Sequence, residues 1–322
     1  MEFEKMFISI KRAALLSVIL LGVGNVKAQK DPCSMTTRLS GGTVFTGNVS
    51  KDIGNGYHAE IWNAVLSGDG KITCFGGDAD CAFKASWNNS GDFLACVGYY
   101  DGSGAKKHTE LGRISAEYCY TKQGSGGNHY SYIGVHGWTR NPLMEYYIVD
   151  DSFHSGVPYG VTKIASYIID GEVYDLYKIT RERCPSIEGT ATFPQVFAVR
   201  RTKRHCGHVS VSEHFKKWEE AGITLGGLYE CKLLCEVGGG QGSIEYTYAT
   251  MRWKGQPGHG IVLGDVNNDD VITMADANAV VNYFLATDKP VDFNVDAADA
   301  NCDGDVTMAD ANQIVNIFLG GE

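Results

Sequence analysis

The chain has 322 residues, 43% of them hydrophobic, enough to bury a full-sized core in one large domain or two. Its 40 Gly, 17 Tyr and only 7 Pro favour many strands joined by tight turns over a helical protein. The formal net charge of -10 is concentrated after residue 261, where 12 acidic residues face one lysine, a net of -11. The near-neutral remainder argues against nucleic acid as a partner.

The first 28 residues have the pattern of a secretory signal peptide. Lys5, Lys11 and Arg12 precede an apolar run over residues 13–23, and small residues lead to an expected cleavage site after Ala28. This run is too short to span a bilayer, and no other stretch is long enough. We therefore expect a secreted protein without a membrane span, placed outside the cell or in a cell-surface complex.

Ten cysteines in an exported chain permit disulfides. The pairings Cys33–Cys96, Cys74–Cys81 and Cys96–Cys119 can all be drawn, and the sequence does not choose among them. Free thiols are the alternative if the habitat is reducing.

Between residues 54 and 253, short β-rich runs are separated by Gly, Asn, Asp and Ser, which predicts an antiparallel sandwich or barrel. One helix interrupts this pattern, over EHFKKWEEAG, with Ser212 as its N-cap and Gly222 as its stop. The predicted strands are HAEIWNAV, KITCF, AFKASWNN, DFLACVGYY, HYSYIGVHGWT, MEYYIVD, SYIIDG, EVYDLYKIT, TFPQVFAVRR, HVSVS, LYECKLLCE and IEYTYATMRW.

Two carboxylates stand out within these strands. In LMEYYIV, residues 143–149, Glu145 and Tyr147 share one strand face, and a buried carboxylate there must be paired or used. A solvent-facing Glu on an exposed sheet is the alternative. Glu236 lies near the end of LYECKLLCE, before the glycine-rich VGGGQGS. Such a pair could serve a glycosidase, in which one carboxyl protonates the leaving oxygen and the other attacks or activates water.

The acidic C-terminal part is an internal repeat. TMADANAVVNYFL at residues 273–285 recurs as TMADANQIVNIFL at 307–319, a period of 34 residues. Each copy follows a loop whose oxygen-bearing residues have the spacing of an EF-hand calcium loop, with a solvated acidic loop as the alternative. Position 6, which favours glycine, is Gly304 in the second loop but Asp270 in the first. The expected ligands are Asp265, Asn267, Asp269, Asp276 and the carbonyl of Val271, and Asp299, Asn301, Asp303, Asp310 and the carbonyl of Asp305.

Two such loops, each opening a helix with an apolar face, resemble a type I dockerin over residues 264–320. The resemblance implies structural Ca²⁺ and docking to a cohesin domain of a scaffold protein. Loop positions 10 and 11, which help to choose the partner in dockerins, are Met274-Ala275 and Met308-Ala309. This near-symmetry would let either half face the cohesin.

Five motifs upstream resemble, in order and spacing, the xylanases of glycoside hydrolase family 11. They are SWNNSGDF, HTELG, GWTRNPLMEYYIVD, CPSIEGTATFPQVFAVRRTKR and HVSVSEHFKKWEEAGITLGGLYE. The resemblance implies an all-β jelly-roll sandwich with one helix, bent like a partly closed right hand. It further implies retaining endo-1,4-β-xylanase activity on xylan without a catalytic cofactor. We expect a monomeric catalytic domain over 29–254, a linker over 255–260 and a small α-helical dockerin over 261–322.

The same resemblance implies roles for individual residues. Glu145 matches the nucleophile, Glu236 the acid/base, and Asp92 the residue that hydrogen-bonds the acid/base. Family members active near neutral pH carry Asn at that position, and acid-active ones carry Asp. We therefore expect an acid-shifted activity profile whose acid limb moves upward in Asp92→Asn, because two carboxyls that share a proton titrate as a pair.

The implied substrate-binding residues include a stacking aromatic, polar groups that hold the nucleophile and the sugar, and the tip of a mobile thumb. For Trp62, a core tryptophan is the alternative. They are Trp62, His136, Tyr147, Arg181, Pro185, Ser186, Ile187 and Gln195, with residues 185–187 at the thumb tip.

Three departures from the family pattern bear on function. The stretch EVGGGQG stands where the family reads EGYQSSG, His136 stands where a cleft tyrosine is expected, and Cys184 lies beside the thumb tip. Because of the altered EVGGGQG stretch, a jelly roll that binds xylan with weak or no catalysis remains an alternative function. A β-glucanase on a similar fold is a further alternative.

Overall fold

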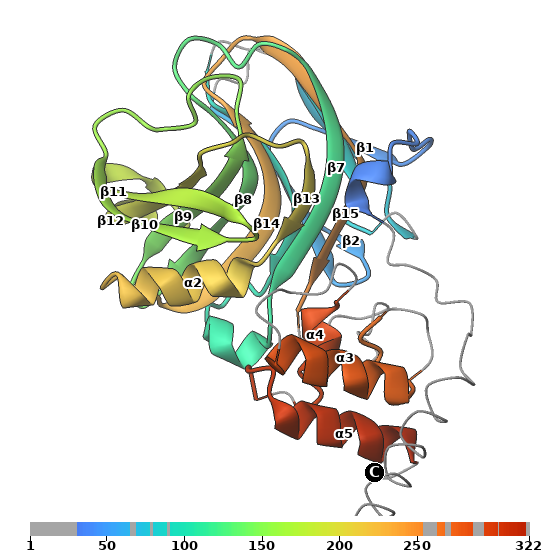
Figure 1. Cartoon of the computed structure of the whole chain (residues 1–322). Helices are drawn as coiled ribbons and strands as arrows, with labels where there is room; N and C mark the ends of the chain where they lie inside the picture. The colour runs from blue at the N-terminus through green and yellow to red at the C-terminus, as the bar shows by residue number, and fades with distance from the viewer. Residues whose placement is uncertain are drawn as a thin grey trace, which may run out of the picture. The chain divides into compact units, whose positions relative to one another are not determined.

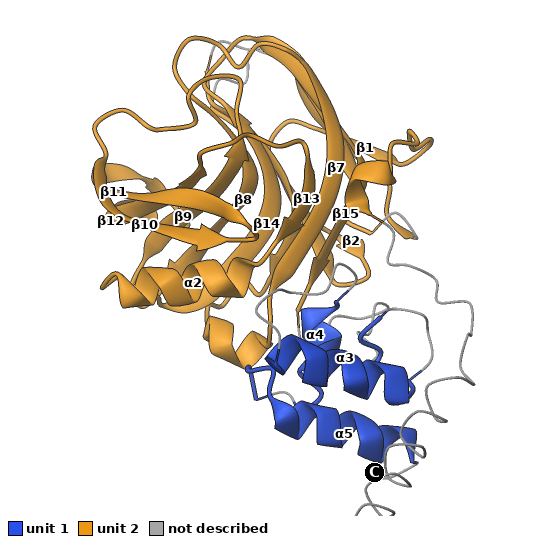
Figure 2. Cartoon of the chain, in the orientation of Figure 1, with its two compact units in different colours: residues 1–29, 262–322 blue, residues 30–261 orange. Residues whose placement is uncertain are grey.

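The computed structural model describes residues 31–64, 69–77, 80–88, 91–253, 263–267, 272–285, 293–301 and 303–319. The chain divides into two compact units, one spanning Lys30–Ile261 and one that includes Val262–Glu322 (Figure 2). The expected signal peptide and linker lie outside the described residues. Within the described ranges, no helix is both long and apolar enough to cross a membrane.

The larger unit consists of two β-sheets packed face to face (Figure 1). The six-stranded sheet has the order β1-β4-β5-β15-β7-β13 and the nine-stranded sheet the order β10-β11-β12-β9-β8-β14-β6-β3-β2. The predicted all-β sandwich is thereby confirmed. The strands are β1 Thr43–Thr46, β2 Val49–Gly54, β3 Tyr57–Asn63, β4 Asp69–Cys74, β5 Phe83–Asn88, β6 Phe93–Tyr100, β7 Ser115–Gly124, β8 Ser131–Arg140, β9 Met144–Asp151, β10 Thr162–Ile169, β11 Glu172–Ser186, β12 Gly189–Arg200, β13 Cys206–Val209, β14 Gly227–Val237 and β15 Gln241–Arg252.

Alternation along each strand builds the core between the sheets. In β5, Phe83, Ala85 and Trp87 are buried in this core while the residues between them face outward. On the opposite face of the nine-stranded sheet lies a second apolar cluster, which includes Tyr147 and Phe197. The nine-stranded sheet is therefore covered on one face by the core and lined on the other by aromatic side chains.

Strand β9, which carries Glu145, lies in the middle of the nine-stranded sheet. It pairs antiparallel with β8 and parallel with β12, and all eight of its residues are buried. The core face of β9 packs against the helix α2, Val211–Glu220, where the Tyr146 ring contacts the rings of Phe215 and Trp218. Both faces of the strand are thus fixed by packing, which sets the direction of the Glu145 side chain.

Three strands were not predicted from the sequence. Strands β1 and β2 are mostly exposed and carry little apolar alternation. Strand β7 does carry a signal, because Ala116, Tyr118 and Tyr120 alternate inward, but charged and polar residues interrupt the run. This segment forms a strand because it pairs with β15, and its composition alone does not predict one.

The helix α2 begins two residues earlier than predicted. Its N-cap is Ser210, whose hydroxyl donates to Asp170 Oδ1 at 2.7 Å, while Ser212 lies within the first turn. The Ser212 hydroxyl instead accepts a hydrogen bond from the Ile114 amide at 2.7 Å. Prediction of Ser212 as the cap was wrong because its oxygen serves a tertiary contact. The helix ends at Glu220, and Gly222 follows with a positive φ of 83°, as the predicted stop requires.

Among the described residues, one disulfide is present, and it joins Cys33 to Cys206. The three pairings drawn from the sequence do not form, and Cys74, Cys81, Cys96 and Cys119 are buried free thiols. A short 3₁₀ helix η1, Pro32–Ser34, places Cys33 against β13, the edge strand that carries Cys206. The pairing could not be predicted because 173 residues separate the two cysteines and only the sheet order brings them together.

The smaller unit has three helices among its described residues: α3 Met274–Leu285, α4 Val295–Ala298 and α5 Met308–Phe318. Val280 and Ile314, at equivalent positions of the two repeats, are fully buried in a small common core. Each repeat also exposes large apolar side chains. The exposed members are Phe284, Leu285, Phe318 and Leu319, together with Met274 and Met308.

Candidate active site

Glu145 points from β9 into a ring of hydrogen-bonding groups. The Tyr147 hydroxyl donates to Glu145 Oε1 at 2.9 Å, and His136 Nε2 lies 3.1 Å from the same oxygen. The Gln195 side-chain amide donates to Oε2. Since the residue is only 8% exposed, a surface carboxylate on a solvated face is excluded. Three neighbours from β8, β9 and β12 fix the orientation of this carboxylate, as a positioned nucleophile requires.

Glu236 lies on β14, which pairs with β6 and β8, and is 6% exposed. Burial, followed by the charges of Asp92 and Glu145, raises its pKa well above the ordinary range, against the opposing hydrogen bond from Tyr147. Its Oε2 is buried and has no protein hydrogen-bond partner among the described residues. A carboxyl with a raised pKa and one oxygen free of protein partners is suited to donate a proton.

Asp92 precedes β6 and hydrogen-bonds both Glu236 and Tyr130. Burial and the charge of Glu145 raise the pKa of Asp92, while the hydrogen bonds and His136 lower it, and the rise wins. The structure thus brings Asp92 and Glu236 into the contact expected from the sequence. Two carboxyls this close to one another are expected to titrate as a pair.

We expect the activity profile of Asp92→Asn to lie at higher pH than that of the wild type. A proton shared between two carboxylates is held tightly and is a weak acid. The pair therefore donates a proton best when both carboxyls are protonated, and this doubly protonated form is lost at low pH as the pH rises. In the variant, Glu236 alone carries the proton and burial still raises its pKa. The shift should be on the order of one pH unit, the usual scale for neighbouring carboxyls.

The pH dependence of kcat/KM on xylan measures this shift. Asp69→Asn, the same change at an exposed Asp on β4, is the control and should leave the profile in place. An Asp92→Asn profile superimposable on that of the wild type would show that the two carboxyls are not coupled.

Tyr147 connects the two carboxyls. Its hydroxyl hydrogen-bonds Glu145 and also contributes a hydrogen bond to Glu236. Burial and the two nearby carboxylates raise its pKa, so it stays a donor. The prediction that Glu145 and Tyr147 share one strand face is confirmed by this contact.

His136 occupies the position where a tyrosine was expected. It is 3% exposed and its ring lies 4.8 Å from the ring of Tyr147. With Nε2 directed at Glu145, His136 contacts the carboxylate itself, so a change at this position acts on Glu145 and not on a distant part of the cleft.

Trp62, on β3, is 42% exposed, so the alternative of a core tryptophan is excluded. Arg181, on β11, is exposed too, and its charge lowers the pKa of Glu236. The sequence assigned Arg181 and Gln195 together to the nucleophile and the sugar. Gln195 contacts Glu145, whereas Arg181 acts electrostatically on Glu236.

Residues 185–187 lie at the hairpin that joins β11 to β12. The Ser186 hydroxyl donates to the Gly189 carbonyl at 2.7 Å, which closes the turn. Arg140, at the end of β8, lies 3.4 Å from Glu188 Oε1 and donates to the Ile187 carbonyl at 3.5 Å. Sequence reasoning missed this anchor, although the arginine stands in the GWTR motif. Cys184 is a half-buried free thiol.

The glycine run after Glu236 has a packing reason. A Cβ at Gly238 would meet the Tyr130 ring at 2.8 Å, and one at Gly240 would meet the Gly127 amide at 2.4 Å. Gly240 also has a positive φ of 78°. The run therefore allows Tyr130, which hydrogen-bonds Asp92, to approach the strand that carries Glu236. Support for the acid/base candidate comes from Asp92 and Tyr147 in place of the expected Tyr and Ser.

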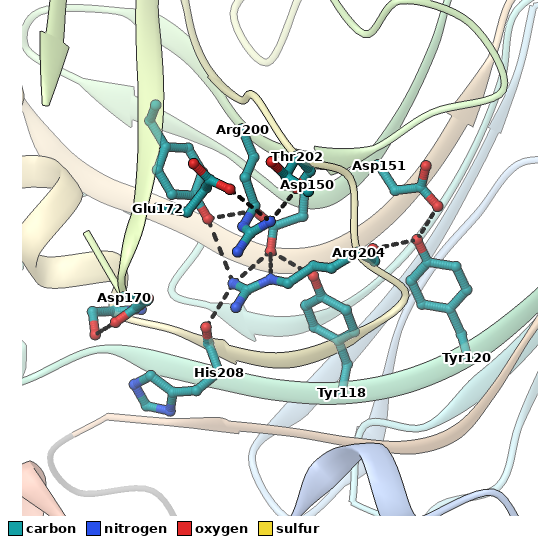
Figure 3. Close-up of polar contacts among 12 residues, drawn as sticks. Tyr118, Tyr120, Asp150, Asp151, Asp170, Glu172, Arg200, Thr202, Arg204 and His208 are labelled. Atoms are coloured by element: carbon teal, nitrogen blue, oxygen red, sulfur yellow. Dashed lines mark hydrogen bonds and ion pairs between the residues drawn. The ribbon is translucent and has the colours of Figure 1, made fainter. Parts of the chain in front are cut away.

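A buried polar network holds the end of β9 against the other sheet. Asp150 is fully buried and accepts hydrogen bonds from the hydroxyls of Tyr118 and Tyr174 and from Arg204 Nε, at 2.5, 2.7 and 2.8 Å (Figure 3). Asp151 accepts from the Tyr120 hydroxyl at 2.7 Å. An unpaired carboxylate would be costly here, so these donors fix the strand that carries Glu145.

The two repeats of the smaller unit place a buried carboxylate in the same way. Asp276 and Asp310 are both 0% exposed, and each accepts backbone N–H bonds from its own loop, including those of Thr273 and Thr307 at 2.8 Å. In the second loop Asp299 accepts from the amides of Asp303 and Gly304 at 3.1 and 3.0 Å.

The sharp turn expected at position 6 of the second loop is present, since Gly304 has a φ of 96°. Asp269 and Val271 of the first loop lie outside the described residues, whereas Asp265 and Asn267 lie within them. In the part of the chain that is described, no three His, Cys, Asp or Glu side chains gather as a metal cluster. The donors are nevertheless all oxygen and include a fully buried carboxylate, which is the chemistry Ca²⁺ prefers.

Both units of the chain match known protein families. The family model for glycosyl hydrolases family 11 matches residues 54–247, more than half of the chain. The chain belongs to glycosyl hydrolase family 11. The model for the dockerin type I domain matches residues 263–319. Dockerin domains of this type bind calcium in general, so this family 11 member carries a domain of a calcium-binding class.

Relatives of this family 11 protein include endo-1,4-beta-xylanase C of Fibrobacter succinogenes, 44% identical over 249 residues, which cover 73% of this chain and 39% of the relative. Endo-1,4-beta-xylanase S20 of Neocallimastix patriciarum is 43% identical over 244 residues, or 74% of this chain and 70% of the relative. The chain therefore spans less than half the length of the first relative and about two thirds of the second. A crystal structure of ENZbleach xylanase matches with a TM-score of 0.67 and 35% identity, over 72% of this chain and 95% of that one.

Proposed function

We propose that this glycoside hydrolase is an endo-1,4-β-xylanase that cleaves internal bonds of xylan with retention of configuration. The observation that carries the proposal is a buried pair of carboxyl groups in unlike environments. Glu145 is held by three hydrogen-bonding neighbours, and burial keeps the pKa of Glu236 high. Retaining glycosidases need such a division between a nucleophile and an acid.

In the first step, the Glu236 carboxyl gives its proton to the glycosidic oxygen while a Glu145 oxygen attacks the anomeric carbon. The bond to the leaving oxygen breaks and a glycosyl ester of Glu145 forms. In the second step, Glu236, now a carboxylate, takes a proton from water, which attacks the same carbon and releases Glu145. Tyr147 hydrogen-bonds both carboxyls, and its single proton can turn toward whichever of them carries the negative charge.

The substrate is tested by release of reducing sugar from xylan, mixed-linkage glucan and cellulose, with binding to each polymer measured in parallel. Release from xylan alone supports the proposal. Xylan binding without release from any polymer would support the binding-module alternative, and release from glucan or cellulose but not xylan would support the β-glucanase.

We infer further that the dockerin binds a cohesin on a scaffold protein through the exposed apolar residues that recur in both repeats. Met274 and Met308 are 41% and 40% exposed, and Leu285 and Leu319 are each 73% exposed. Matched pairs of this kind support two equivalent docking orientations. Residues 1–28, as a signal peptide, would deliver the enzyme to the outside of the cell.

Ca²⁺ would be held in the second loop by Asp299, Asn301, Asp303, Asp310 and the carbonyl of Asp305, and in the first by the corresponding residues. Bound there, the ion would neutralise acidic side chains and tie each loop to its helix. Family 11 catalysis does not use it.

We expect a calcium chelator to abolish capture of the protein by an immobilised cohesin while the rate of xylan hydrolysis changes by less than about twofold. The small core of the dockerin depends on the loops, whereas the catalytic carboxyls lie in the other unit. In calorimetry, Asp310→Ala should bind calcium at one site instead of two, because the second loop loses a ligand. Undiminished cohesin capture in excess chelator would contradict the structural role of calcium.

A further inference from the structure

A buried lysine lies on the cleft face of the nine-stranded sheet, outside the carboxyl pair described above. Lys232, on β14, has a side chain that is 0% exposed, and its Nζ lies 2.8 Å from Glu60 Oε2 and 2.5 Å from Glu230 Oε2. The ammonium also lies 5.2 Å from the centre of the Tyr100 ring. A buried ammonium is costly unless paired, so this group must be held by both carboxylates.

The two carboxylates differ in what else they can reach. The Glu230 side chain is 4% exposed, whereas that of Glu60 is 30% exposed. Glu60 also lies two residues before Trp62 on β3, and residues at this spacing share a strand face. Glu60 therefore presents a partly open carboxylate beside an exposed indole ring.

Lys232 also favours the ionised form of the Glu60 carboxyl. Burial opposes its charge, but the charge and hydrogen bond of Lys232, with smaller contributions from His136 and His58, lower its pKa overall. Glu60 lies opposite Cys96 across β3 and β6, and Cys96 belongs to the same buried cluster as Tyr147, so Glu60 lies on the face of the sheet that carries the nucleophile candidate Glu145. An ionised carboxylate has two acceptor oxygens, and the hydrogen bond from Lys232 goes to Oε2.

We propose that Glu60 is a further substrate-binding residue, an acceptor for sugar hydroxyls beside the stacking position that the family resemblance assigns to Trp62, with Lys232 as the positioning residue that fixes the Glu60 carboxylate. A xylose ring would lie on the indole of Trp62 while adjacent hydroxyl groups donate to Glu60. This division, an apolar face for the ring and a charged acceptor for its hydroxyls, suits a pyranose, which has an apolar face and a polar rim. The inference rests on the proposed function, because it takes xylan as the ligand.

The chain offers a matched pair of variants. Glu60→Gln and Glu230→Gln each remove one carboxylate from Lys232, but only Glu60→Gln removes the charged acceptor in the cleft. We expect Glu60→Gln to raise KM for xylan about tenfold, more than it lowers kcat, because a charge-assisted hydrogen bond becomes a neutral one. For Glu230→Gln we expect a KM within about twofold of that of the wild type. Both variants should lose a similar amount of thermal stability, because each removes one carboxylate from Lys232.

Binding is measured separately from hydrolysis, by calorimetry of xylo-oligosaccharides with the same two changes placed in a Glu145→Gln background. Glu60→Asp is the second variant, since it keeps a charge for Lys232 but withdraws the acceptor by one methylene, and it should also weaken binding. Equal KM and Kd values for the Glu60 and Glu230 variants would overturn the substrate-binding role of Glu60. A wild type that neither binds nor cleaves xylan would overturn the proposed function instead.

Discussion

Glu145→Ala should lower kcat on xylan by roughly 10⁴-fold or more, on the scale seen when a nucleophile is removed from an enzyme. Without this carboxylate no group in the ring formed by His136, Tyr147 and Gln195 can form the covalent glycosyl intermediate. Those three neighbours remain to hold substrate, so xylan binding should survive. Steady-state hydrolysis and pull-down with insoluble xylan measure the two quantities.

A matched control and a chemical test separate this role from a structural one. Glu245, on β15 in the other sheet, is 7% exposed and paired with Arg38 and Lys84, so Glu245→Ala removes a buried carboxylate away from the site. It should keep most of the activity. Added azide should restore turnover in Glu145→Ala by attacking in place of the carboxylate, giving a glycosyl azide of inverted configuration. Failure of azide to act in a folded variant would argue against nucleophilic attack by Glu145.

The local sequence pattern was sufficient to predict those parts of the site that lie on a single strand. The alternation in LMEYYIV places Glu145 and Tyr147 on the same face, and the hydrogen bond between them follows directly. The two calcium-type loops likewise follow from spacing, because a repeat of 34 residues carries its ligands with it. In such cases the partners are close in sequence, so no knowledge of the sheet order is needed.

Contacts between distant segments were beyond local pattern. Lys232 lies 172 residues from Glu60, and β6 separates their two strands in the sheet order. Cys33 and Cys206 are a further example. Each residue alone reads as an ordinary surface charge or an unassigned thiol. Their meaning depends on strand order, which sequence periodicity does not specify.

The EVGGGQG stretch shows how tertiary packing can replace an expected motif. From the sequence, loss of the usual Tyr and Ser left Glu236 without visible support. In the structure that support comes from Asp92 and Tyr147, and the glycines make room for Tyr130. A departure from a family motif therefore weakens a role only when the missing contacts are not supplied from elsewhere in the fold.

Glu236→Ala should lower kcat on xylan by about 10²- to 10⁴-fold, the usual contribution of a general acid, and the loss should depend on the leaving group. A sugar alcohol leaves poorly unless it is protonated, whereas a dinitrophenolate needs no proton. The variant should therefore form the glycosyl ester of Glu145 from a dinitrophenyl xylobioside at a nearly normal rate. The ester then accumulates, since Glu236 is no longer present to deprotonate water.

Azide distinguishes this variant from Glu145→Ala. It needs no general base, so it should speed release of the ester and give a glycosyl azide of retained configuration, opposite to that from Glu145→Ala. The pH profile should also lose its high-pH limb, because the buried carboxyl with the raised pKa is gone. An equal loss on xylan and on the dinitrophenyl substrate would assign Glu236 to binding or folding, and the proton donor would then have to be sought in Asp92.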